Sequence, residues 1–110
     1  MSIQEIKLSE LSYDAETRAG LMLAFFWEPL DSNCRKERER IKKAIEEIGE
    51  QIKVGICSVE TSPELAERLG VKSIPTTILL KEGKERERLV GLQHEGTLIR
   101  HLRRYLETEA

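Results

Sequence analysis

Residues 21–34 read LMLAFFWEPLDSNC, which joins a strand pattern to the start of a helix. The first six residues are continuously apolar and follow Gly20, as is typical of a short strand that is covered on both faces. The three residues Asp31 to Asn33 are all types that prefer the N-cap of a helix. The sequence therefore predicts a buried strand, a short loop and then a long helix from about Cys34 to Gly49.

Strand and helix patterns alternate along the rest of the chain. We predict, in order, an edge strand with Ile3, Ile6 and Leu8, a helix to Arg18 for which Ser9 and Ser12 offer caps, the strand at 21–26, the long helix, a strand at 53–59, a helix from Pro63 to a stop at Gly70, a strand at 76–80, a strand at 85–90 and a helix from about Gly96 to Leu106. This alternation is typical of an α/β fold with helices on both faces of a central sheet. Lys81 to Lys84 form a turn between the last two strands, which makes the sheet mixed.

Length and composition restrict the class of protein. The chain has 110 residues, of which 39% are hydrophobic and 35% charged, and its net charge is -2. One domain over residues 1–110 is expected, without a nucleic-acid partner, because broad nucleic-acid binding needs a cationic surface. No secretory signal pattern is present and the longest apolar run, Leu21 to Trp27, is too short to cross a bilayer, so we expect a cytoplasmic protein with no membrane partner. Abundant Glu, Lys and Arg beside little Asn and Gln indicate thermostability.

Several short motifs occur in the order and spacing of a known family. They are Phe26-Trp27, the loop that ends at Cys34, Ile74-Pro75-Thr76, the turn Lys81-Glu82-Gly83-Lys84 and Gly91. Together they resemble the thioredoxin family over almost the whole chain, from about Ile6 to Leu106. The resemblance implies a thioredoxin fold, with a central mixed sheet flanked by helices, and a cis peptide bond between Ile74 and Pro75.

The active-site loop departs from the family pattern. In the family this loop carries Trp-Cys-Gly-Pro-Cys-Lys, which overlies Leu30, Asp31, Ser32, Asn33, Cys34 and Arg35. The resemblance implies that Asp31 replaces the nucleophilic cysteine, whereas Cys34 keeps the place of the resolving thiol. The buried acid of the family falls at Phe25, and its lysine neighbour falls at Ile56. A carboxylate forms no disulfide bond, so conventional disulfide reductase activity is not expected, and whether the chain is an enzyme stays open.

Two functions remain open for such a chain. In the first, it is a binding module that holds a peptide or a partner protein in an apolar groove beside the cis-proline, formed by Trp27, Leu30, Ile74, Pro75 and Gly91. In the second, it is a single-thiol redox protein in which Cys34 forms mixed disulfides that an external thiol resolves. We favour the first, in which self-association through the same apolar residues is a variant. No cofactor is expected for either.

The cysteines and the tryptophan each have a structural and a functional interpretation. Cys34 is in phase with the apolar face of its helix, which favours a buried side chain over a reactive thiol. Cys57 lies in a strand pattern and is expected in the core. Trp27 fits the core and the rim of the site equally well.

The charged and histidine side chains are expected at the surface. The run from Arg35 to Lys43 and the run from Glu85 to Arg88 have the pattern of solvated helix and strand faces. His94 and His101 have no cluster of ligand residues around them in the sequence, so no metal site is predicted.

Overall fold

The computed structural model describes residues 4–49 and 52–107. Its elements are β1 (Glu5–Lys7), α1 (Tyr13–Thr17), β2 (Leu21–Trp27), α2 (Ser32–Ile48), β3 (Lys53–Ser58), α3 (Pro63–Arg68), β4 (Thr76–Lys81), β5 (Lys84–Val90) and α4 (Glu95–Glu107). The predicted alternation of strands and helices is confirmed. Ile3, predicted in the first strand, lies outside the described residues.

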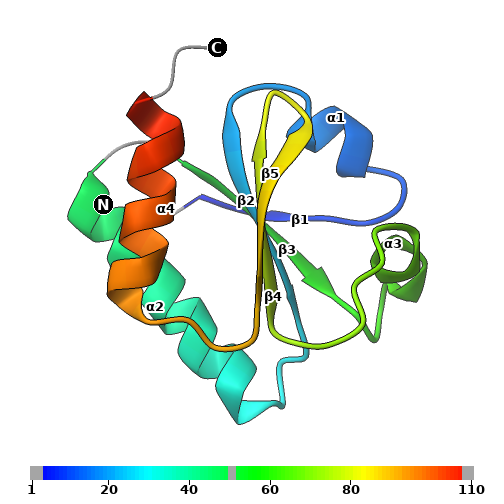
Figure 1. Ribbon diagram of the computed structural model, residues 1–110. Helices are drawn as coiled ribbons and strands as arrows, with labels where there is room; N and C mark the ends of the chain where they lie inside the picture. Colours follow the sequence, from blue (N-terminus) through cyan, green and yellow to red (C-terminus); the bar gives the residue numbers. More distant parts are fainter. Residues whose placement is uncertain (1–3, 50–51, 108–110) are drawn as a thin grey trace.

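The five strands form one sheet in the order β1-β3-β2-β4-β5. β3 runs parallel to β1 and β2, whereas β4 runs antiparallel to β2 and β5. Figure 1 shows α2 and α4 on one face of this sheet and α1 and α3 on the other. The predicted mixed sheet with helices on both faces is confirmed, and β2 is its central strand.

Alternate side chains of β2 enter two separate cores, because successive residues of a strand point to opposite faces. Leu23 and Phe25 pack with residues of α2 and α4, and Ala24 and Phe26 pack with residues of α1 and α3. All six residues at positions 21–26 are buried. The predicted strand covered on both faces is confirmed. The loop that leads to α2 begins at its carboxyl end.

Helix α2 begins earlier than the sequence predicts. Asp31 is its N-cap, and the Asp31 carboxylate accepts a hydrogen bond from the Cys34 N–H at 2.9 Å. The first of the three consecutive capping residues takes the cap, so Ser32 and Asn33 belong to the first turn, and the predicted start at Cys34 is wrong. The helix stops as predicted at Gly49, whose φ of 76° is left-handed and suits a residue without a Cβ.

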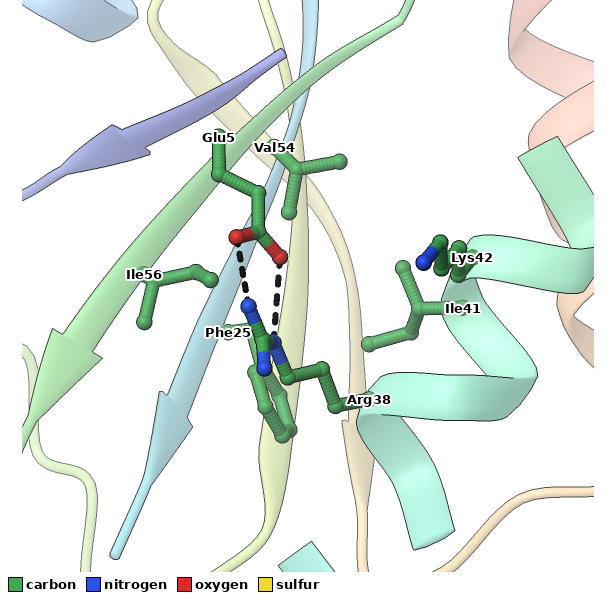
Figure 2. Close-up of a pocket in the computed structure, with 7 residues that line it drawn as sticks. All are labelled: Glu5, Phe25, Arg38, Ile41, Lys42, Val54 and Ile56. Carbon is green, nitrogen blue, oxygen red and sulfur yellow. Dashed lines mark hydrogen bonds and ion pairs between the residues drawn. The ribbon is translucent and has the colours of Figure 1, made fainter. Parts of the chain in front are cut away.

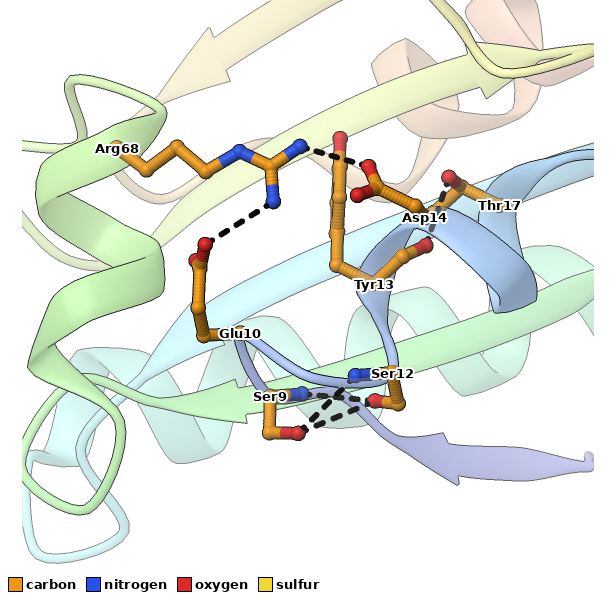
Figure 3. Close-up of polar contacts among 7 residues, drawn as sticks. All are labelled: Ser9, Glu10, Ser12, Tyr13, Asp14, Thr17 and Arg68. Carbon is orange, nitrogen blue, oxygen red and sulfur yellow. Dashed lines mark hydrogen bonds and ion pairs between the residues drawn. The ribbon is translucent and has the colours of Figure 1, made fainter.

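Arg68 of α3 ties the two helices of one face together (Figure 3). Its guanidinium donates to Asp14 Oδ1 at 2.6 Å and to Glu10 Oε1 at 3.3 Å, and it lies 5.3 Å from the centre of the Tyr13 ring. These groups are largely exposed, so the pairs add little to the free energy of unfolding. They join α3 to α1 and to the turn before it.

The two serines predicted as caps bond to each other in the turn before α1, where Ser12 takes the N-cap position (Figure 3). The Ser9 N–H donates to the Ser12 hydroxyl at 3.0 Å, and the Ser12 N–H donates to the Ser9 hydroxyl at 3.3 Å. Ser12 is the N-cap residue but its side chain does not bond to the helix. The first N–H of α1, at Tyr13, donates to the Ser9 carbonyl at 3.0 Å.

Gly55 of β3 lies against the Leu8 side chain, which leaves no room for a larger residue. A Cβ at Gly55 would lie 2.7 Å from Leu8 Cγ and 3.1 Å from Met22 Sδ, so the Gly55→Ala substitution must displace Leu8. We expect this change to lower the free energy of unfolding by about 1–3 kcal/mol, measured by urea denaturation. Gly96→Ala is the control, because its added methyl meets no atom within 4 Å and alanine in a helix is better than glycine. Unchanged stability of Gly55→Ala would contradict this packing.

Candidate functional site

Asp31 occupies the N-terminus of α2, at the end of the loop that follows β2. The Asp31 N–H donates to the Glu28 carbonyl at 3.0 Å, which folds the loop into a turn. The hydrogen bond from the Cys34 N–H lowers the pKa of the Asp31 carboxyl, so this side chain is an anion at neutral pH. Negative charge is favoured there because the first N–H groups of a helix have no intrahelical partner.

Cys34 lies in the first turn of α2 and points into the core between α2 and the sheet. None of its surface is exposed, and it packs in the same core as Phe25 and Ile41. Burial raises the pKa of the Cys34 thiol to about 11, and the carboxylates of Asp31 and Glu28 act in the same direction. The thiol is therefore protonated at neutral pH and lies out of reach of solvent.

The second cysteine lies on the opposite face of the sheet. Cys57 of β3 is buried, as predicted, among residues that pack with α1 and α3. Burial raises the pKa of its thiol to about 11. Because the sheet separates Cys57 from Cys34, the two sulfurs do not form a disulfide, and both cysteines are free.

The Ile74–Pro75 peptide bond is cis and lies at the same end of the sheet as the loop. Phe26 pairs with Thr76 in the β2–β4 register, so Trp27 and the proline come next to each other on neighbouring strands. The Pro75 carbonyl accepts a hydrogen bond from the Gly91 N–H at 2.8 Å, which brings the segment after β5 to the same place. The ends of β2 and β5 and the start of β4 thus meet beside the cis-proline.

The five residues predicted to form the groove differ in exposure. Leu30 is 85% exposed, which is unusual for a large apolar side chain in this protein. Pro75 is buried, and the partly exposed members are Trp27, Ile74 and Gly91. We call these five residues the cis-proline surface.

Trp27 belongs to both the core and the rim of this surface. Its ring centre lies 5.6 Å from that of Phe25, and the Arg38 guanidinium lies 5.3 Å from the centre of the Trp27 ring. One side of the indole therefore packs on the core, while a cation covers another part of it.

A small pocket lies next to Phe25 and Ile56, the two positions where the resemblance implies an acid and a lysine (Figure 2). These two apolar residues are partners in the β2–β3 register. Arg38 donates to Glu5 at 2.6 and 3.1 Å across the pocket. The space admits about one water molecule, so it is too small for a ligand.

Glu37 is a buried carboxylate that sequence reasoning missed. The run from Arg35 to Lys43 was expected to be solvated, but the Glu37 side chain has no exposed surface. Its carboxylate accepts hydrogen bonds from the Gln93 N–H at 2.9 Å and from the Thr77 hydroxyl at 3.1 Å. Burial raises the pKa of Glu37, and these two hydrogen bonds partly offset that rise. Its helical spacing from Cys34, three residues earlier, was the signal that places Glu37 on the buried face.

The two histidines differ from each other. His94 is exposed, as predicted. His101 is not the solvated residue that was expected, because its side chain is only 18% exposed and its Nδ1 lies 3.4 Å from Glu87 Oε1. The same Glu87 oxygen accepts a hydrogen bond from the Tyr105 hydroxyl at 3.1 Å. In the part of the chain that the structure describes, no group of three or more His, Cys, Asp or Glu side chains is arranged to hold a metal ion.

Acidic residues lie beside the exposed Leu30. The Leu30 N–H donates to Glu28 Oε1 at 3.4 Å. The neighbouring Glu28 side chain raises the pKa of Glu60, which follows β3. The loop around Leu30 thus carries acidic side chains, with the Arg35 guanidinium bonded to the Pro29 carbonyl at 3.0 Å beside them.

The sheet order, the two pairs of helices and the cis-proline beside a helix N-terminus define a thioredoxin fold. A solved structure, a mutant thioredoxin from Halobacterium salinarum NRC-1, superposes with a TM-score of 0.80 at 24% identity and covers 97% of this chain and 95% of that chain. The family model described as Thioredoxin matches residues 4–104. The chain belongs to the thioredoxin family.

Two curated thioredoxins are similar to this chain over nearly their whole length. Thioredoxin of Bacillus subtilis (strain 168) is 32% identical over 101 residues, which is 92% of this chain and 97% of the relative. Thioredoxin of Listeria monocytogenes serovar 1/2a is 29% identical over 100 residues, which is 91% of this chain and 97% of the relative. Within residues 4–49 and 52–107, none of the helices is both long and apolar enough to cross a membrane.

The burial of Cys34 predicts a slow thiol reaction. In a Cys57→Ala variant, where Cys34 is the remaining cysteine, we expect 5,5′-dithiobis(2-nitrobenzoate) to react at neutral pH at least about 100-fold more slowly than with free cysteine, because the thiolate is the attacking species. The same variant in denaturing urea should react at the rate of a free thiol. A fast reaction of the folded variant would show that the thiol is accessible.

The buried carboxyl of Glu37 predicts how stability depends on pH. Its pKa in the folded state lies above the ordinary value of 4.5, so the folded protein holds this proton more tightly than the unfolded chain. The resulting stabilisation is full below the ordinary pKa and is lost as the pH rises through the raised pKa. The glutamine of Glu37→Gln does not titrate. Relative to this variant, the free energy of unfolding of the wild type should therefore fall as the pH rises from the ordinary pKa to the raised pKa. Parallel pH profiles of the two proteins in urea denaturation would rule this out.

Proposed function

We propose that this chain is a thioredoxin-like protein without dithiol reductase activity, which binds an extended peptide or a segment of a partner protein at the cis-proline surface. The observation that carries the proposal is the placement of sulfur and charge at the start of α2. Asp31 holds an anion at the helix N-terminus, while the Cys34 thiol is buried and protonated. Disulfide exchange needs an accessible thiolate and a second thiol to resolve the mixed disulfide, and this end of α2 supplies neither.

The apolar side chains of the surface support binding. Leu30 is 85% exposed, and covering it with a partner removes apolar area from water. Among the described residues, no hydrogen bond to the Ile74 backbone is found, whereas the neighbouring Pro75 carbonyl is taken by the Gly91 N–H. The Ile74 backbone groups are thus suited to pair with an extended segment, as a strand edge pairs with an added strand.

The alternative function, single-thiol redox chemistry at Cys34, is less well supported. It needs a thiol that reaches a disulfide and ionises near neutral pH, but Cys34 is fully buried and burial raises its pKa to about 11. The proposal includes a cytoplasmic location, which is consistent with membership of the family, and a thermostable fold, which the abundance of Glu, Lys and Arg supports. The binding test also decides whether the partner is a different protein or a second copy of this chain.

The two most exposed leucines provide a matched test of the binding surface. We expect carboxymethylated insulin B chain, an extended peptide without thiols, to bind the wild type in a fluorescence anisotropy titration. Leu30→Glu should weaken this binding at least about fivefold, because it removes roughly 1 kcal/mol of apolar contact and adds charge. Leu11→Glu is the control, since Leu11 is 97% exposed and lies in the turn before α1.

The outcomes separate the possible occupants. Equal affinity of both leucine variants, or no binding by the wild type, would contradict the proposed surface. Concentration-dependent dimerisation that Leu30→Glu abolishes, measured by analytical ultracentrifugation, would identify a second copy as the partner.

A further inference from the structure

Helix α2 holds both backbone groups of one residue in the segment after β5. The Glu37 carboxylate accepts from the Gln93 N–H at 2.9 Å, and the Arg40 guanidinium donates to the Gln93 carbonyl at 2.8 Å. The second oxygen of Glu37 accepts from the Thr77 hydroxyl at 3.1 Å. Glu37 and Arg40, which lie about one turn apart on α2, thus fix the path of the chain at Gln93.

This contact continues to the cis-proline through hydrogen bonds. The Gln93 side-chain Nε2 donates to the carbonyls of Val90 and Gly91, both at 3.1 Å. The Gly91 N–H in turn donates to the Pro75 carbonyl at 2.8 Å. A continuous chain of contacts therefore links the buried carboxylate of α2 to the cis-proline surface.

We propose that Glu37 is a positioning residue for the cis-proline surface, which acts by anchoring the segment from Gly91 to Gln93 against α2. This inference rests on the proposed function, because it assigns Glu37 to the surface that binds the partner. Glu37 does not itself reach that surface, since its side chain has no exposed area.

The energetics of burial favour a positioning role over simple core packing. Removing a carboxylate from water costs several kcal/mol, and an apolar side chain fills the same volume without that cost. Gln93 is only half-buried and lies in the segment between β5 and α4, where water can bond to backbone groups, so its N–H does not require a buried acid for its own sake. One carboxylate oxygen bonds to Thr77 of β4 and the other to Gln93 after β5. The Glu37 carboxylate therefore fixes the position of the segment after β5 relative to β4 and α2.

Three variants of α2 distinguish the anchor from its packing volume. Glu37→Met fills a similar volume without hydrogen-bond acceptors. Glu37→Gln keeps an oxygen for the Gln93 N–H, and its amide can donate to the Thr77 hydroxyl oxygen. Glu39→Met makes the same apolar change at an exposed position of the same helix and is the control.

We expect Glu37→Met to speed hydrogen exchange of the Gln93 amide about tenfold or more and to weaken binding of carboxymethylated insulin B chain about fivefold, because the acceptor of the Gln93 N–H is lost. Glu37→Gln and Glu39→Met should leave both quantities within about twofold of the wild type. Global stability, measured by urea denaturation, separates this local effect from general unfolding. Wild-type exchange at Gln93 in Glu37→Met, or faster exchange with unchanged binding, would overturn the proposal.

The test also separates this inference from the proposed function. If the wild type does not bind the peptide, the proposed function fails, and the exchange rate of the Gln93 amide alone decides whether Glu37 positions the segment. If Glu37→Met does not fold, Arg40→Met removes the bond to the Gln93 carbonyl from a partly exposed side chain. Arg40→Met leaves the Gln93 N–H bonded to Glu37, so exchange at Gln93 should stay within about twofold of the wild type. Faster exchange would show that Arg40 and not Glu37 holds the segment, and would overturn the proposal.

Discussion

The hydrogen bond from the Cys34 N–H to the Asp31 carboxylate, at 2.9 Å, links the fold of this protein to its chemistry. It sets the first residue of α2. The helix then turns Cys34, Glu37 and Ile41 toward the sheet, where all three are buried. The same bond places a permanent negative charge at the helix N-terminus, where the local potential favours an anion. The position of α2 therefore determines both which side chain carries charge at the site and which sulfur is buried.

The polar groups of the core differ from those that the family resemblance implies. Phe25 and Ile56 face each other across β2 and β3 as apolar partners, and the space beside them is closed by the Arg38–Glu5 ion pair. The buried carboxylate comes instead from α2, at Glu37. Its partners lie on β4 and in the segment after β5, next to the cis-proline. Buried charge in this protein is thus connected to the proposed binding surface through the backbone rather than to a reactive thiol.

Sequence patterns predicted the fold well because its main determinants are local. The continuous apolar run of β2 and Gly49 after α2 each have one structural interpretation, which agrees with the whole fold. The predicted start of α2 was wrong because Asp31, Ser32 and Asn33 are all good caps, so their residue types alone do not distinguish which of them begins the helix. Glu37 was missed because its charged neighbours suggested a solvated face. Its spacing of three residues from Cys34 indicated the buried face instead. His101 was misplaced because its contact with Glu87 joins α4 to β5, which no local pattern encodes.

The central claim, that this member of the thioredoxin family does not reduce disulfides, is tested most directly by the insulin reduction assay with dithiothreitol as the reductant. We expect the protein to precipitate insulin no faster than dithiothreitol alone, because Asp31 stands at the N-terminus of α2 and the Cys34 thiol is buried. A clear acceleration by the wild type that is lost in Cys34→Ser would contradict it.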